Sequence, residues 1–298
     1  WFGDKTTERL MREQRRIREQ TFIRVNRSKT SMQYIKEALD ANRIRYTSTF
    51  LPGALKIEKA FFSLSSTIEA LQGLIYQQEL ASQTPIHCID FQGLKKKQRT
   101  IRILDMAASP GSKLTQLIDQ LSWWNIPYEI TALEPEEKRL TKLINNLQRQ
   151  GVSEVSIYHQ QAQQFTSEKP FDLILLDTPC SGNLIGDRNW LQKRNREGIQ
   201  KVAALQKKLL KKGSELLSSD GLLLYSTCSM EREENEENID WCINEGILTP
   251  VSIPLKIPFN TKTLKVPESK HNQLIERAVR FHPSISYTEP FFVCCLKK

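Results

Sequence analysis

The sequence predicts an α/β protein whose larger part is a parallel sheet with helices on both faces. Two observations carry this prediction. After residue 100, short apolar runs bounded by loops alternate with amphipathic helical stretches, as in a parallel sheet. Before that point the units are shorter and richer in strand-like segments. The 298 residues, 39% of them apolar, suffice for one large domain with a small companion.

The first hundred residues predict three parts. Residues 1–21 are dense in Arg and Glu and predict an exposed basic helix. Residues 22–92 predict a small α/β module, with strands at FIRVN, RYTSTF and ALKI, one helix from Ser31 to Asn42 and another opening at Ser66. Residues 93–99, GLKKKQR, predict an exposed basic connector.

Residues 93–298 predict the large domain. Its expected strands are IRILD, YEITALE, VSIYH, FDLILLD, LLLYS and FFVCCL, and its helices cover 113–121, 138–150 and 199–217. Ligands of such sheets bind beyond the carboxyl ends of the strands. We therefore expect a site in the loops that follow Asp105, Glu134, Asp177 and Ser226.

Charge and cysteine usage narrow the class of protein. The net charge of +9 suits a polyanionic partner such as a nucleic acid, although a merely basic soluble protein has the same composition. Six cysteines without a CxxC pair argue against a disulfide scaffold and against a metal site, and Cys294 and Cys295 are expected in the core. No apolar stretch of membrane-spanning length occurs, so we expect a cytoplasmic protein with no membrane partner.

The stretch LDMAASPGSKLTQL places an acidic residue at a strand end, then small residues, a glycine and a helix. Small residues let a ligand approach the backbone, and a helix N-terminus favours negative charge. Glu134 ends the next strand, where a carboxylate accepts hydrogen bonds from ribose hydroxyls. This spacing indicates a nucleoside cofactor. A plain strand-to-helix turn and a helix-capping glutamate are the structural alternatives.

Two polar loops that carry cysteines follow two neighbouring strands. DTPCSG contains Cys180 and STCSM contains Cys228, and neither cysteine lies in an apolar run, as a structural cysteine usually does. A thiolate that adds to C6 of a cytosine makes C5 nucleophilic towards a sulfonium methyl donor. A carboxyl group near N3 assists that addition, and Asp177 is the candidate. The residues alone do not say which cysteine attacks.

These motifs resemble the RNA cytosine-C5 methyltransferases of the Nop/Sun type. The resemblance runs from about Phe22 to the C-terminus, and it rests on DMAASPGSKLTQ, DTPCSG and YSTCSMEREENE in this order. Weaker matches are NLQRQG, GLIYQQELAS, FIRVN and RFHP. The resemblance implies a class I, Rossmann-like methyltransferase sheet with an N-terminal RNA-binding module.

The resemblance also implies residue roles. Cys228 is expected as the nucleophile, Cys180 in product release, Asp177 at N3, and Lys113 beside them as a fourth catalytic residue. The cofactor is expected to be S-adenosyl-L-methionine. The residues expected to bind it are Ala107, Ala108, Ser109, Pro110, Gly111, Ser112, Lys113, Glu134, Arg139, Gln161 and Asp177.

The chain departs from the family pattern at four places. Ser109 stands where Ala is usual, and Glu134 replaces the commoner Asp but keeps the carboxylate. Gln161 stands where the family often carries an Asp near the adenine amino group, and its carbonyl still accepts a hydrogen bond. The loop NLIGDRNW replaces an arginine-rich version, which puts target handling there in doubt.

The target and some alternatives stay open. The chain ends at Lys298, as in compact archaeal-type members, so we expect a monomer that acts on transfer RNA rather than ribosomal RNA. The competing interpretations are a methyltransferase for DNA or a small molecule, a catalytically silent RNA-binding or assembly factor, and a cysteine hydrolase. The intact Cys180, Cys228, Asp177 and Lys113 argue against a silent factor, and no oxyanion motif accompanies His159.

Overall fold

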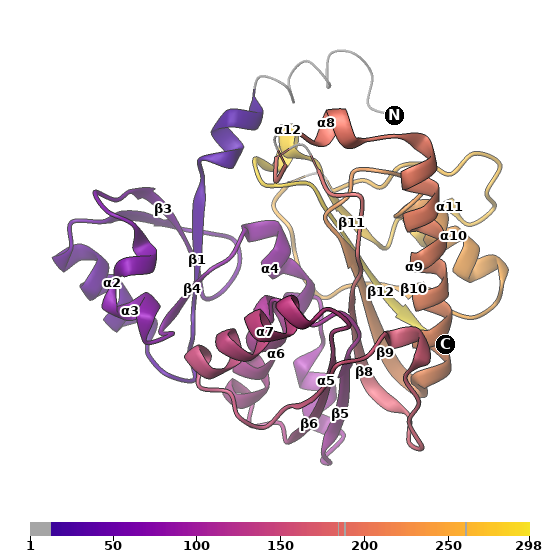
Figure 1. Cartoon of the computed structure of the whole chain (residues 1–298), viewed down its shortest axis with the longest axis horizontal. Coiled ribbons are helices and arrows are strands. Elements are labelled where there is room, and N and C mark those ends of the chain that lie inside the picture. Colours follow the sequence, from indigo (N-terminus) through magenta and orange to yellow (C-terminus); the bar gives the residue numbers. More distant parts are fainter. Residues whose placement is uncertain (1–12, 184, 188, 260) are drawn as a thin grey trace.

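The computed structural model describes residues 13–298 apart from 184, 188 and 260. It contains a four-stranded sheet near the N-terminus and an eight-stranded sheet built by the rest of the chain, side by side in Figure 1. Residues 13–18 are helical, and residues 1–12 of the expected basic helix lie outside the described part. None of the described helices is long and apolar enough to cross a membrane.

The smaller sheet is antiparallel, with the order β2-β3-β1-β4. Its strands are β1 (Thr21–Val25), β2 (Arg45–Ser48), β3 (Ala54–Lys59) and β4 (Ile75–Gln77). The helix α2 (Met32–Ala41) begins as predicted, because the Ser31 side chain accepts a hydrogen bond from the Tyr34 N–H. Apolar residues of α2 and of three strands form one core, which includes Ile23, Ile35, Leu55 and Ile75.

Two predictions in this region are wrong in detail. Residues 64–66 form the short 3₁₀ helix η1 (Leu64–Ser66), and Thr67, not Ser66, caps the following α3 (Ile68–Leu71) through the Ala70 N–H. The expected connector is partly helical: Asp90 caps α5 (Phe91–Lys96), which takes in the first residues of the basic run. The helix α4 (Leu80–His87) precedes it.

The larger sheet has the order β10-β12-β9-β8-β5-β6-β7, and β11 pairs with β12. Its first strands are β5 (Ile101–Asp105), β6 (Tyr128–Leu133), β7 (Ser156–Tyr158), β8 (Phe171–Asp177) and β9 (Leu217–Thr227), which run parallel. β10 (Thr249–Val251), β11 (Val279–Phe281) and β12 (Phe291–Lys297) pair antiparallel. The sheet that the sequence predicts as parallel is therefore mixed at this edge.

Helices cover both faces of this sheet. α6 (Ser112–Trp123) and α7 (Glu137–Gln150) lie on one face, and α9 (Arg196–Leu216) and α10 (Glu236–Asn244) lie on the other (Figure 1). Short elements complete the chain: η2 (Ala162–Gln164), α8 (Trp190–Lys193), α11 (Asn272–Ile275) and α12 (Pro283–Ser286).

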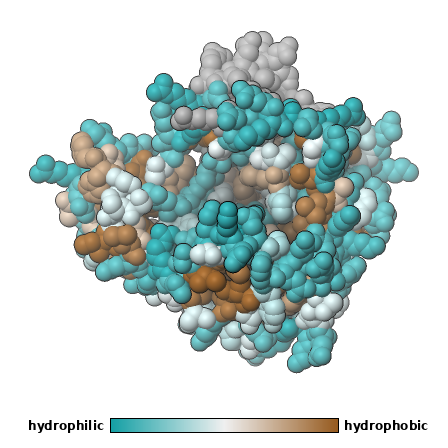
Figure 2. Space-filling view, in the orientation of Figure 1, coloured by the Kyte–Doolittle hydropathy of each residue, from teal (hydrophilic) through white to brown (hydrophobic). Residues whose placement is uncertain are grey.

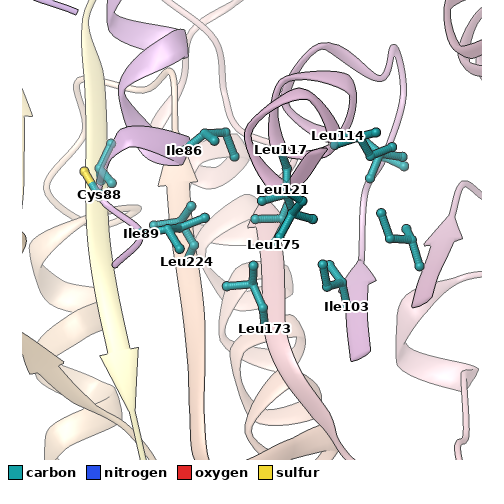
Figure 3. Close-up of a cluster of buried hydrophobic side chains, with 14 of the residues drawn as sticks. Ile86, Cys88, Ile89, Ile103, Leu114, Leu117, Leu121, Leu173, Leu175 and Leu224 are labelled. Atoms are coloured by element: carbon teal, nitrogen blue, oxygen red, sulfur yellow. The ribbon is translucent and has the colours of Figure 1, made fainter. Parts of the chain in front are cut away.

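Alternate residues of the central strands enter two separate cores, because successive side chains of a strand point to opposite faces. Ile103, Leu175 and Leu224 meet Leu114, Leu117 and Leu121 of α6 (Figure 3). Leu104, Ile174 and Leu223 meet Leu209 and Leu210 of α9. Cys294 and Cys295 are buried in the two cores, as expected. This double burial explains the apolar run LILL of β8 and the run LLLY, residues 222–225, of β9.

Candidate active site

The order in which the chain adds strands to the sheet reverses between β5 and β8. From β5 it continues outward to β6 and β7, then returns to β8 beside β5 and continues to β9. A crevice opens beyond the carboxyl ends of the strands at such a switch point. Asp105 and Asp177 end these two strands, and Asp177 lies level with Ser226 of β9. The loops that the sequence singled out therefore meet at one edge.

The two predicted cysteines are in direct contact. The Sγ atoms of Cys180 and Cys228 lie 2.7 Å apart, although 48 residues separate them in the chain. Both side chains are half-buried between the loops that follow β8 and β9. The hydrogen bond between them lowers the pKa of Cys180 and, with burial, raises the pKa of Cys228 well above its ordinary value. The pair thus shares a proton that lies on Cys228 when Cys180 is ionised.

Lys113 and Asp177 form an ion pair beside the cysteines. The Lys113 Nζ lies 2.6 Å from Asp177 Oδ2, and Ser226 Oγ donates to Asp177 Oδ1 at 2.6 Å. Lys113 is buried, and its ammonium lies 5.0 Å from the centroid of the Phe291 ring. Burial and two partners, Asp177 and the Phe291 ring, hold the lysine in one orientation, with its charge directed at the carboxylate. This cation is also close enough to Cys228 to lower the pKa of that thiol somewhat.

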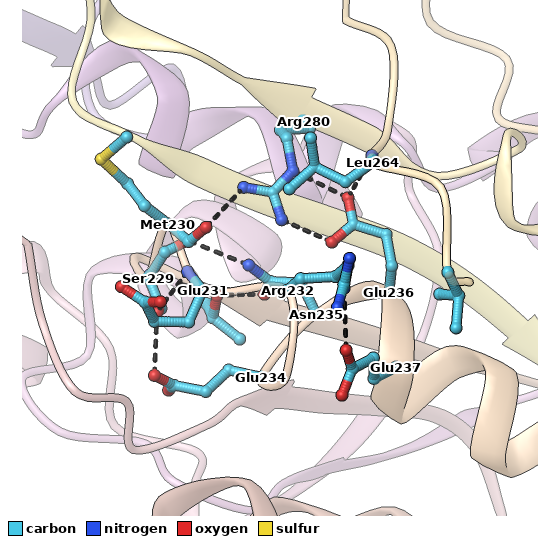
Figure 4. Close-up of polar contacts among 12 residues, drawn as sticks. Ser229, Met230, Glu231, Arg232, Glu234, Asn235, Glu236, Glu237, Leu264 and Arg280 are labelled. Atoms are coloured by element: carbon cyan, nitrogen blue, oxygen red, sulfur yellow. Dashed lines mark hydrogen bonds and ion pairs between the residues drawn. The ribbon is translucent and has the colours of Figure 1, made fainter. Parts of the chain in front are cut away.

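Glu234 fastens the two cysteine loops to one another, a role that the sequence prediction missed. Its fully buried carboxylate accepts hydrogen bonds from the Ser181 N–H at 3.0 Å and from the Ser181 hydroxyl. It also accepts one from Ser229 Oγ at 2.9 Å (Figure 4). Gln206 Nε2 of α9 donates to it at 2.9 Å. Since Ser181 and Ser229 directly follow Cys180 and Cys228, Glu234 sets the spacing of the thiols.

A buried ion pair supports the same loop from the opposite side. Arg280 of β11 contacts both carboxylate oxygens of Glu236, at 2.7 and 2.5 Å, and donates to the Met230 carbonyl at 3.1 Å (Figure 4). In the sequence, Glu234 and Glu236 lie in the acidic run EREENEEN, which is typical of solvent-exposed charges at the start of a helix. The one available signal was that Glu234 and Glu236 belong to the ENE of the family motif.

The predicted cofactor loop leads from β5 into α6. Gly111 caps this helix with φ +94°, and a Cβ there would come within 2.9 Å of Leu143 Cδ1, so only glycine fits without strain. Ser109 and Arg139 are tied reciprocally: Ser109 Oγ donates to the Arg139 carbonyl at 2.8 Å, and Arg139 Nη2 donates to the Ser109 carbonyl at 2.9 Å. The departure to Ser109 thus adds a hydrogen bond between the loop and α7.

Three acidic side chains surround this loop. Glu134 is buried, accepts from the Glu136 N–H at 3.0 Å and lies 3.5 Å from the Arg139 guanidinium. Burial, aided by Asp177 and Glu134, raises the pKa of Asp105 to about 7. A cationic sulfonium or ammonium group placed among these carboxylates would offset the repulsion between them. The N–H groups at the start of α6 and the Lys113 ammonium suit a carboxylate. The donor set therefore fits S-adenosylmethionine.

The remaining predicted residues lie around this cluster at different depths. Ala108 and Ser109 are buried, whereas Pro110 is exposed and its carbonyl accepts a hydrogen bond from Asn146 Nδ2 at 2.8 Å. Gln161 is exposed and precedes η2 just beyond β7, without a side-chain capping hydrogen bond and apart from the contacts that join Lys113, Asp177 and the cysteines.

The loop after the first cysteine carries a further residue that the sequence prediction missed. The buried Asn183 donates from Nδ2 to the Cys228 carbonyl at 3.1 Å and accepts from the Ile185 and Gly186 N–H groups. The side-chain amide of Asn183 thus joins the two cysteine loops. Nothing else in the segment NLIGDRNW predicts this role.

Comparison with known proteins identifies the family. Residues 92–297 match the family model described as 16S rRNA methyltransferase RsmB/F. The chain belongs to the RsmB/F methyltransferase family. The resemblance to Nop/Sun-type enzymes is thereby confirmed, and S-adenosylmethionine is the methyl donor of this RsmB/F family.

Curated relatives agree with the family assignment. The chain is 35% identical over 240 residues to "Ribosomal RNA small subunit methyltransferase F" of Escherichia coli O157:H7, covering 79% of this chain and 47% of that protein. It is 30% identical to the protein of the same name from Psychromonas ingrahamii, covering 93% and 56%. The chain thus spans about half the length of these curated RsmB/F relatives.

Solved structures confirm the fold. A methyltransferase homologue from Pyrococcus horikoshii superposes with a TM-score of 0.80 at 28% identity and covers 99% of both chains. NSun6 from the same organism, solved with SFG, gives a TM-score of 0.81 at 21% identity, covering 100% of this chain and 95% of that one. The class I methyltransferase fold predicted for this RsmB/F member is therefore correct.

Proposed function

We propose that this protein transfers a methyl group from S-adenosylmethionine to C5 of a cytosine in RNA through a covalent adduct with Cys228. The contact between the Cys180 and Cys228 Sγ atoms, at 2.7 Å, carries the proposal. A single thiol suffices for a structural role or for a simple nucleophile. Two thiols in contact at the cofactor edge of the sheet suit a reaction in which one thiol adds to the base and another assists its release.

The proton shared by the two cysteines provides a route to the nucleophile. When Cys180 is ionised, the Cys228 thiol points its proton at the Cys180 sulfur, so transfer over one hydrogen bond leaves Cys228 as the thiolate. The Cys228 thiolate then adds to C6 of the cytosine. After C5 has taken the methyl group, a base removes the C5 proton, the double bond between C5 and C6 re-forms, and the bond from C6 to the Cys228 sulfur breaks. Cys180 assists this release.

Asp177 and Lys113 act at the other side of the base. While the thiolate adds to C6, N3 of the base takes up a proton. A carboxyl group hydrogen-bonded to N3 holds that proton in place. The ion pair at 2.6 Å and the Ser226 hydroxyl keep the Asp177 carboxyl in place for this contact. Lys113 compensates the negative charge that forms on the two thiols and on Asp177 as protons are transferred.

The cofactor is held by residues 107–113 together with Glu134, Arg139, Gln161 and Asp177. The methyl donor supplies an electrophilic methyl group on a sulfonium sulfur. The Glu134 carboxylate accepts from the ribose hydroxyls, the Gln161 carbonyl accepts from the adenine amino group, and the N-terminus of α6 faces the carboxylate. The acidic surroundings of Asp105 favour the cationic end of the molecule.

We also propose a division of labour along the chain. The catalytic domain comprises residues 93–298, and residues 22–92 form an RNA-recognition module preceded by the basic segment 1–21. Arg18 supports this arrangement, because its Nε donates to the Ile185 carbonyl at 2.8 Å and so joins the segment to the loop after Cys180. The protein is proposed to work as a monomer in the cytoplasm.

Ribosomal RNA is the proposed substrate class, with transfer RNA as the alternative. The sequence favoured transfer RNA, but the curated relatives are named for the small-subunit ribosomal RNA. Either target cytosine must be unpaired or flipped out to reach Cys228.

The decisive experiment is adduct trapping. The Cys180→Ala variant, incubated with S-adenosylmethionine and transcripts of small-subunit ribosomal RNA or transfer RNA, should accumulate a protein–RNA band that survives denaturing electrophoresis. The Cys228→Ala variant should give neither band nor methylation. Cys242→Ala, which removes a buried thiol of α10, is the control and should behave as the wild type. A band from Cys228→Ala but not from Cys180→Ala would reverse the assigned roles.

A further inference from the structure

A cavity of about 480 Å³ lies where the N-terminal segment, the small sheet and the C-terminal part of the chain meet. Its walls come from Arg16 and Phe22, from β2, β3 and the turn between them, and from residues 286–288. Figure 2 shows a hollow at the centre of the molecule between the small sheet and the large one, rimmed largely by hydrophilic side chains. The cavity volume falls in the range of small-ligand pockets, roughly 300–1,000 Å³.

Aromatic rings form the apolar part of this cavity. Phe22 is buried, and Phe50 is fixed edge-on against Phe259 with ring centroids 5.5 Å apart. Tyr287 is 37% exposed and has a left-handed backbone with φ +54°, which is unusual for an aromatic residue. Tyr287 adopts this conformation as the C-cap of α12, a common way for a helix to end.

Cations and hydroxyl groups form the polar part. The Arg16 guanidinium lies 5.9 Å from the centroid of the Tyr287 ring, and Lys56 lines the same wall. Arg16 lies 3.8 Å from Glu13 and Lys56 lies 3.2 Å from Glu58, but both pairs are solvent-accessible. Such pairs stabilise little, so a phosphate can compete for the cations at small cost.

A short chain of contacts links the cavity wall to the nucleophile. Two residues after Tyr287, the Glu289 N–H donates to Glu79 Oε1 at 3.1 Å, and the Glu289 carboxylate accepts a hydrogen bond from the Asn183 side chain. Asn183 in turn donates to the Cys228 carbonyl at 3.1 Å. These contacts tie the segment that carries Tyr287 to the loops that carry the two cysteines.

We propose that this cavity, the Tyr287 pocket, holds the base of an unpaired nucleotide that neighbours the target cytidine. The inference rests on the proposed function. A flipped cytidine leaves its neighbour unstacked, and an aromatic ring replaces the lost stacking without reading the sequence. Tyr287 stacks on that base, and Arg16 and Lys56 contact the adjoining phosphates. The hydroxyl groups that line the cavity hydrogen-bond to the edge of the bound base, whichever base it is.

The test uses the full chain with S-adenosylmethionine and single-stranded RNA 12-mers that carry one cytidine flanked by 2-aminopurine, whose fluorescence is quenched by stacking. Wild type should quench the probe. Tyr287→Asn, which keeps a residue tolerant of the left-handed backbone but removes the ring, should lose the quenching and bind the 12-mer on the order of tenfold more weakly. Tyr287→Phe should retain both. Phe61→Ala, which removes a 68% exposed ring in the bend after β3 and outside the pocket, is the matched control.

The outcomes separate this pocket from the proposed function. Quenching and affinity that Tyr287→Asn leaves unchanged, or that Phe61→Ala lowers equally, would overturn the pocket. If Tyr287-dependent quenching occurs in a protein that forms no 5-methylcytidine on any RNA, the pocket stands and the proposed reaction fails. Normal methylation with an unchanged KM for RNA in Tyr287→Asn overturns the pocket and leaves the reaction intact.

Discussion

The thiols of Cys180 and Cys228 are in contact at 2.7 Å, although each belongs to a different loop and strand. Parallel pairing of β8 with β9 puts Asp177 level with Ser226, and the two loops start from this common level. Glu234 then draws the loops together through Ser181 and Ser229. The contact is thus a product of sheet register and one buried carboxylate.

The first prediction concerns the ionisation of the pair. Because Cys180 raises the pKa of Cys228, Cys180→Ala should let iodoacetamide alkylate Cys228 at lower pH than in wild type. Cys228→Ala removes the hydrogen bond that lowers the pKa of Cys180, so alkylation of Cys180 should require higher pH. Alkylation followed by peptide mass spectrometry across a pH series measures both. Identical pH profiles in wild type and variants would show that the thiols ionise independently.

The second prediction concerns Glu234. Glu234→Gln replaces an acceptor-only group with one that has a single oxygen acceptor, so a buried donor at Ser181 or Ser229 loses its partner. We expect a loss of about 1–3 kcal/mol in the free energy of unfolding, and a fall in kcat with little change in S-adenosylmethionine affinity. Glu237→Gln, which alters a partly exposed pair with Arg232, is the control. Equal effects of the two variants would mean that Glu234 has no special role.

The strands of the large sheet and the site loops could be predicted because they depend on local patterns. β8 is buried on both faces and therefore reads as a continuous apolar run, and the motif loops follow directly from strand ends. β10 and β11, of three residues each, have no such pattern, and antiparallel pairing of β12 with β9 depends on contacts between distant segments. Glu234 was missed because its burial depends on α9 and on both loops.

The third prediction concerns Asp105. Its pKa of about 7 in the folded protein lies above the ordinary value near 4, so its contribution to stability is fully present below about pH 4 and is lost as pH rises through 7. Asp105→Asn should therefore stabilise the cofactor-free protein above pH 7, by up to about 4 kcal/mol, with no such gain at pH 4. Denaturant unfolding at several pH values measures this. A stability difference independent of pH would contradict it.

The fourth prediction concerns the buried pair of Arg280 and Glu236. Arg280→Met leaves a fully buried carboxylate without its cation and should cost about 3–5 kcal/mol. The double variant Glu236→Leu/Arg280→Met should recover part of that loss, since the uncompensated charge is gone. Lys201→Met, which breaks an exposed pair with Glu197, should change stability by less than about 1 kcal/mol. An additive double variant would argue that the pair is not coupled.

The most direct measurement of the proposed reaction is nucleoside analysis after methylation. The protein is incubated with radiolabelled S-adenosylmethionine and, separately, with small-subunit ribosomal RNA, transfer RNA and DNA, and the digested nucleosides are separated. We predict label in 5-methylcytidine from an RNA pool, ribosomal RNA first, and none with Cys228→Ala. Label in any other nucleoside, or no label in any pool from a protein that binds S-adenosylmethionine, would contradict the proposal.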